Sequence, residues 1–190
     1  MPDSARGIDF IGHSDQGGRL DGVQVMVQRG FAYVGHTFSG GFSIIDVGDS
    51  TKPKASGFVA APPNTRSLHL QTHDDLLLAI NAQDPLSSNG GQQDRNYTAG
   101  LRVFDISKPG QPQEIGFMPV EGQGVHRIWY VGGRYAYVSA TLDGFTDTIF
   151  MIVDLSDPQR PFEVSRWWLP GMWRDGGESP SWEDNRRYAL

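Results

Sequence analysis

Histidine is the residue of this sequence best suited to catalysis and metal binding, because it titrates near neutral pH and is a common metal ligand. The chain has five histidines, His13, His36, His69, His73 and His126, and no cysteine. Disulfides, thiolate zinc sites and cysteine nucleophiles are therefore excluded in this chain. His69 and His73 would form a metal-binding pair on a helix, but on a strand they lie about 13 Å apart. Which histidines act together depends on the elements that carry them.

The sequence repeats itself at a spacing of about 50 residues, which is typical of stacked structural units. An apolar run rich in β-branched residues ends at Asp46, at Asp105 and at Asp154, and a proline stands seven residues after each aspartate. An aspartate at this place can accept bonds from the backbone amides just ahead of it. We therefore expect the three aspartates to cap turns and not to be catalytic.

Each repeat reads as four antiparallel strands. Val23, Val25 and Val27 alternate with other residues, as in a half-buried strand. The remaining strands of the first unit are expected over 31–34, 42–46 and 55–60. Those of the third unit are expected over 125–130, 135–140, 148–154 and 162–168. The second unit follows the same order, with Gln24 aligned on His69 and His36 on Asn81, and has a polar insertion at 84–100.

Both ends of the chain resemble parts of further units. Residues 7–11 resemble the fourth strands that begin at Gly57 and Gly116, and residues 187–190 resemble the second strand of the third unit. A β-propeller closes its ring by lending a terminal strand to another blade. We therefore predict an all-β propeller of four-stranded antiparallel blades, with about three blades, part of a fourth and an N-terminal ring-closing strand.

The Ile-Ile-Asp, Val-Phe-Asp and Ile-Val-Asp strand ends at Asp46, Asp105 and Asp154 resemble those of the LVIVD-repeat β-propellers. The resemblance covers nearly the whole chain and implies that it corresponds to the N-terminal half of a full-length member. It implies no catalytic residue, because the motif concerns strands and turns. The domain organisation expected within 1–190 is a closing strand and crossing loop (1–20), three blades (21–63, 64–120 with the 84–100 insertion, 121–170) and the start of another blade (171–190).

The meander topology groups the polar residues by rim. Loops between second and third strands lie on the same rim as the crossings from one blade to the next, and we call this the crossing rim. His36, His69 and His126 are expected there as catalytic groups. The expected substrate-binding residues at the same rim are His13, Arg19, Gln24, Asn81, Arg95 and Asp143. Loops on a rigid sheet often carry such groups, but strand capping would explain each histidine singly.

His69 and His126 start inner strands of consecutive blades, close to the central axis, and could hold a divalent zinc, iron or manganese ion. The alternative is a polar channel lining that bonds to water. The first functional hypothesis is an enzyme acting on a small, anionic organic molecule at this rim, by hydrolase, lyase or isomerase chemistry. The second is a non-catalytic scaffold for protein–protein interaction.

Composition limits the partners. The formal net charge of −6 argues against nucleic acid, and no apolar run is long enough to span a membrane. A cytoplasmic location fits these features and the absence of cysteine. The expected partners are a small-molecule ligand and a second chain, or a C-terminal half, that completes the propeller.

Overall fold

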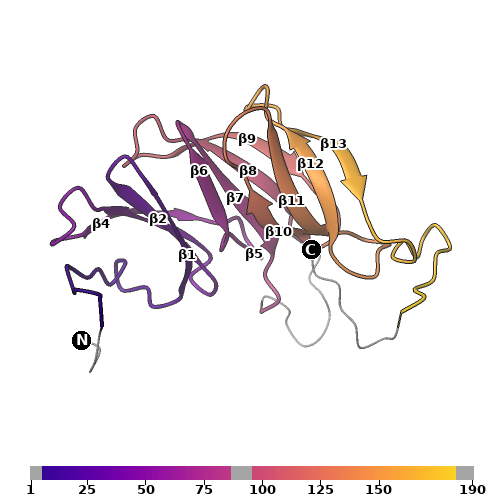
Figure 1. Cartoon of the computed structure of the whole chain (residues 1–190), viewed down its shortest axis with the longest axis horizontal. Coiled ribbons are helices and arrows are strands. Elements are labelled where there is room, and N and C mark those ends of the chain that lie inside the picture. Colours follow the sequence, from indigo (N-terminus) through magenta and orange to yellow (C-terminus); the bar gives the residue numbers. More distant parts are fainter. Residues whose placement is uncertain (1–5, 87–95, 183–190) are drawn as a thin grey trace.

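The computed structural model describes residues 6–86 and 96–182, which form thirteen strands and no helix. Three antiparallel sheets lie side by side (Figure 1). The first sheet consists of β1 (Gly22–Gln28), β2 (Phe31–His36), β3 (Gly41–Asp46) and β4 (Lys54–Ala60). The second consists of β5 (Thr65–Arg66), β6 (Leu70–His73), β7 (Leu76–Gln83), β8 (Gly100–Asp105) and β9 (Gln113–Pro119). The third consists of β10 (Gly124–Trp129), β11 (Tyr135–Thr141), β12 (Ile149–Asp154) and β13 (Phe162–Trp167).

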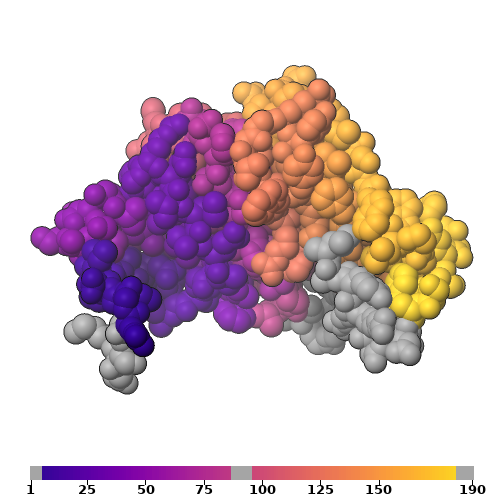
Figure 2. Space-filling view, viewed as in Figure 1, coloured from indigo at the N-terminus to yellow at the C-terminus, as the bar shows by residue number. Residues whose placement is uncertain are grey.

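The three sheets are blades of a β-propeller, as the repeat predicts, and they do not close into a barrel. Each is a meander in which neighbouring strands follow one another in sequence. In blade 2, β5 and β6 both pair with β7 and form the two halves of one interrupted inner strand. Figure 2 shows the blades as one body, with residues 6–20 and residues 171–182 at opposite ends.

The repeated aspartates keep one register in all three blades. Asp46 lies opposite Phe31, Asp105 opposite Leu76 and Asp154 opposite Tyr135. In each blade the carboxylate accepts a bond from the backbone N–H two residues ahead, at 2.7–2.9 Å. These contacts confirm the expectation that the aspartates cap the turns between third and fourth strands.

Each blade has two faces, because successive side chains of a strand point to opposite sides. We call the face toward the next blade the forward face and the other the rear face. The forward face of blade 1 packs on the rear face of blade 2 through Tyr33, Phe42, Ile44, Leu70, Leu77 and Phe104. The forward face of blade 2 packs on the rear face of blade 3 through Leu78, Leu101, Val103, Ile128, Val138 and Met151. The core therefore lies between the blades.

Each inner strand is irregular where it starts at the crossing rim. The pairing register shifts between Gly22 and Gln24 in β1 and between Val125 and Arg127 in β10, and β5 and β6 are separated by residues 67–69. Bulges re-aim side chains. His126 is the extra residue of the β10 bulge, and the gap between β5 and β6 contains His69.

The predictions for the two ends have different outcomes. Residues 7–11 form no strand, since the structure has no blade beside them with which they could pair. Residues 187–190 lie outside the described residues, and in 171–182 the pairing found is a single bridge between Phe145 and Trp173. No helix in the described part of the chain is long and apolar enough to cross a membrane.

Candidate functional site

His69 is held at the crossing rim by a residue of the preceding blade. Gln24 Oε1 lies 3.1 Å from the backbone nitrogen of Leu70 and 3.0 Å from His69 Nδ1. Because the Leu70 N–H must donate, the amide oxygen of Gln24 faces both groups and accepts from both. His69 therefore carries its proton on Nδ1, and the lone pair of the neutral ring is on Nε2.

The same strand position contributes a polar side chain in all three blades. Gln24 lies opposite Gly35 and Arg127 opposite Ser139, while His69 accepts a backbone bond from Ile80. Because the blades stack on one another, these three side chains form a series in which each lies next to that of the following blade. Arg127 Nη1 lies 3.4 Å from His69 Nδ1, and since that nitrogen already donates to Gln24, the guanidinium acts on the ring as a nearby positive charge.

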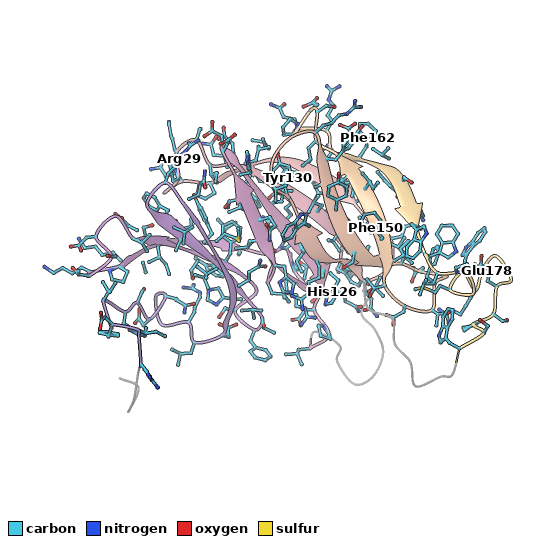
Figure 3. The ribbon with its side chains drawn as sticks, viewed as in Figure 1. Arg29, His126, Tyr130, Phe150, Phe162 and Glu178 are labelled. Carbon is cyan, nitrogen blue, oxygen red and sulfur yellow. The ribbon has the colours of Figure 1, made fainter. Side chains whose placement is uncertain are left out.

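His126 joins this series from the bulge in β10. Its ring meets that of His69 edge to face, with centroids 6.1 Å apart. His69 is 5% exposed, whereas His126 is exposed and lies near the lower ends of the strands in Figure 3, where β10 begins. The structure thus brings together three of the predicted residues, Gln24, His69 and His126.

Burial and positive neighbours keep both imidazoles neutral. Burial, followed by Arg127, His126 and Arg66, lowers the pKa of His69 to about 4. Burial, Arg127 and Arg66 lower the pKa of His126, although Asp147 acts in the opposite direction. At neutral pH the positive charge of the site therefore comes from the two arginines.

Arg66 and Arg127 were not among the residues predicted from the sequence. Arg66 Nε is buried and has no hydrogen-bond partner among the described residues. A signal was present, because Arg66 stands three residues before His69 and Arg127 directly follows His126. Both histidines of the cluster, His69 and His126, thus come with an arginine close in sequence.

The predicted metal site does not fit these residues. No group of three or more His, Cys, Asp or Glu side chains that could hold an ion occurs within 6–86 and 96–182. His69 uses Nδ1 for Gln24, and two guanidinium groups near the imidazoles disfavour a divalent cation. The donor set is suited to an anion.

His36 lies apart from this cluster, on the rear face of blade 1. Its Nδ1 is 3.0 Å from Asp21 Oδ1 and its Nε2 is 2.8 Å from Ser43 Oγ. This is the bonding order of a catalytic triad, but His36 and Ser43 are buried, at 0% and 1% exposure. Burial raises the pKa of Asp21, but bonds from Ser39, Phe38 and His36 outweigh it and hold the pKa well below its ordinary value. The network therefore anchors the loop between β2 and β3, in place of the predicted catalytic role.

The other predicted residues are dispersed. The Arg19 guanidinium lies 3.7 Å from the centre of the Phe58 ring. Asn81 is buried and donates to the Thr98 carbonyl at 2.6 Å. Asp143 lines a separate hollow of about 480 Å³ with Tyr97 and Glu121.

His13 follows Gly12, which packs against the Ser50 backbone in the turn between β3 and β4. That turn is on the rim opposite to the crossing rim, so the predicted placement of His13 is wrong. Arg95 lies outside the described residues.

The blades and their repeated aspartate turns define a β-propeller class of protein. The LVIVD repeat family model matches residues 21–60 and 125–167, which correspond to blades 1 and 3. The chain therefore contains LVIVD repeats, in agreement with its resemblance to the LVIVD-repeat proteins. No curated protein matches it.

Among solved structures, the chain is similar to the N-terminal domain of Nup159, with 11% sequence identity and a TM-score of 0.29. The match covers 76% of this chain and 48% of that one, so this chain spans about half the length of the Nup159 domain. A likeness this distant carries no argument about function.

Proposed function

We propose that the crossing rim binds a small organic anion at a site formed by Arg66, His69, His126 and Arg127. The observation that carries the proposal is the buried Nε of Arg66, which has no partner among the described residues although it lies close enough to depress the pKa of both histidines. A buried donor without an acceptor is costly, and a carboxylate or phosphate oxygen would satisfy it.

The charge balance supports an anion of modest size. Arg66 and Arg127 act on both imidazoles, whereas the carboxylate of Asp147 acts on the His126 ring. Guanidinium groups bind carboxylates and phosphates through paired, charge-assisted hydrogen bonds. The net charge of −6 makes this local positive site distinct from the rest of the surface.

The imidazoles would have different roles toward a bound anion. With a pKa of about 4, His69 is a weak proton acceptor at neutral pH and serves to orient the ligand. His126 is exposed beside it and is neutral as well, so it is the group we expect to accept a proton if the site is catalytic. Hydrolase, lyase and isomerase chemistry all remain compatible with such a group.

Isothermal titration calorimetry with phosphate and with citrate, in a low-salt amine buffer, tests the proposal. Removing one charge-assisted bond costs about 1.5–3 kcal/mol, so Arg66→Gln and Arg127→Gln should each weaken binding about 10- to 100-fold. Arg160→Gln is the matched control, since its side chain is 88% exposed and its contact with Asp157 spans 4.0 Å. Equal affinity of all three variants, or no binding by the unmodified protein, would contradict the proposal.

The scaffold hypothesis has support from a different part of the molecule. Two sheet faces at opposite ends of the blade stack have exposed apolar side chains, among them Val25 on blade 1 and Trp129 on blade 3.

A further inference from the structure

The rear face of blade 1 is built as a blade–blade interface but has no blade against it. Val25 occupies the position of Leu70 in blade 2 and Ile128 in blade 3, since the three lie opposite Val34, Ala79 and Val138. Leu70 and Ile128 are 0% and 8% exposed, whereas Val25 is 57% exposed. Val23 and Val27 on the same strand are also more than half exposed.

The forward face of blade 3 is also built as a blade–blade interface and has no blade against it. Tyr137 occupies the position of Tyr33 and Leu78, since all three lie opposite equivalent residues of the third strand. Tyr33 and Leu78 are fully buried, but Tyr137 is 38% exposed and stacks on Phe150 at 6.1 Å. Trp129 and Trp167 are 63% and 49% exposed. An apolar patch of this kind on a protein surface marks an interaction site.

The N-terminal segment covers only part of the blade 1 face. Arg19 lies on Phe58 of β4, and the Gln16 carbonyl accepts a bond from Ser43 of β3. Between this segment and β1 a cavity of about 340 Å³ remains, which is lined by Val23, Val25, Val34, Ile45 and Val47. The segment thus lies over the outer strands, and the inner strand β1, where blades of a propeller approach each other most closely, stays open.

We infer that two copies of this chain associate into a closed ring of six blades. The forward face of blade 3 of each copy packs on the rear face of blade 1 of the other, and a two-fold axis relates the two contacts. This pairing of faces continues the interface that already joins blade 1 to blade 2 and blade 2 to blade 3. Closed, symmetric assemblies are the usual outcome of such self-complementary surfaces, and six blades is within the range of propellers.

Ring closure also continues the polar series at the crossing rim. Within one chain, Gln24 contacts His69, and His69 lies beside Arg127. At each new junction, Arg127 would lie next to Gln24 of the partner subunit. The ring would then carry the sequence Gln, His, Arg twice around its axis, and both copies would contribute to the lining of the channel.

Sedimentation velocity of the full chain over a range of concentrations tests the inference. The unmodified protein should sediment as a species of twice 20.9 kDa. Val25→Glu and Trp129→Glu should each shift it to the monomer mass, because each change places a carboxylate in both contacts of the ring. Phe38→Glu is the matched control: Phe38 is 71% exposed but lies in the loop between β2 and β3, outside both faces, so its variant should remain dimeric.

Mixing the two disrupted variants identifies the geometry. A Val25→Glu chain and a Trp129→Glu chain together retain one contact with both faces intact, so the mixture should recover a dimer that neither variant forms alone. All the altered side chains are already exposed, and circular dichroism should show unchanged folding. A monomeric unmodified protein at the highest concentration, or a dimer that survives Val25→Glu, would overturn the inference. Neither result depends on whether the rim binds an anion.

Discussion

Acidification should destabilise this protein through His69. Above pH 6.5 the ring is neutral in both the folded and the unfolded chain, and His69 contributes nothing to the pH dependence. Between pH 6.5 and about 4 the unfolded chain binds a proton that the folded chain does not. The free energy of unfolding therefore decreases as the pH is lowered through this range. Below about 4 both states are protonated, and this contribution becomes constant.

The size of the effect follows from the two pKa values. Each pH unit between 6.5 and about 4 costs up to about 1.4 kcal/mol, which gives an upper limit of about 3 kcal/mol. Arg127 and His126 are exposed, and solvent screens their charges. We therefore expect a loss of about 2 kcal/mol in the free energy of unfolding.

Urea unfolding at a series of pH values, at one protein concentration, measures this loss. The reference is His69→Asn, whose side-chain amide can still donate to Gln24 Oε1 but does not titrate. The difference between the two proteins removes the contribution of the carboxylates that titrate in the same range. The reasoning is refuted if both proteins lose the same stability, or if NMR titration of the His69 ring gives a pKa of 6.5 or above.

Two further predictions concern the contact between blades 1 and 2. Gly35→Ala should lower the melting temperature strongly, because the new Cβ would overlap the backbone carbonyl oxygen of Leu68. The control is Gly48→Ala, whose Cβ would meet only the Asp46 carboxylate, at 3.2 Å, and which should be nearly neutral in the same thermal scan. Tyr33→Phe should cost about 1 kcal/mol in urea unfolding, since its hydroxyl donates to the Pro109 carbonyl at 2.9 Å; an unchanged midpoint would show that this bond is not formed in solution.

The sequence was sufficient to predict the strands of the blades, because the contacts that form each turn are local and recur in every repeat. Asp46, Asp105 and Asp154 each accept a bond from the amide two residues ahead, a contact that needs no distant partner. Alternation of valines in β1 and the glycine-containing turns are local in the same sense. The strands therefore lie where the pattern places them, whereas the strand expected over 7–11 is absent because it needed pairing with a blade outside the repeat.

The candidate site was only partly accessible from the sequence. Aligning the repeats identified Gln24 and His69 as equivalent, and the structure shows them in contact at 3.0 Å. The alignment could not show that Arg127, and not His126, takes the same position in blade 3, because a bulge shifts the register by one residue. It also grouped His36 with the other histidines, although His36 lies on the rear face of its blade.

What the sequence by itself determined is the repeated blade, whose turns and strand alternation depend on residues close together in the chain. Only the tertiary structure decided which polar side chains meet. Gln24, His69 and Arg127 belong to three different sheets, and their contact exists because apolar faces stack those sheets around one axis. The depressed pKa of His69 has the same origin, since burial and the neighbouring arginines come from the packing of blades and from no local feature of the chain.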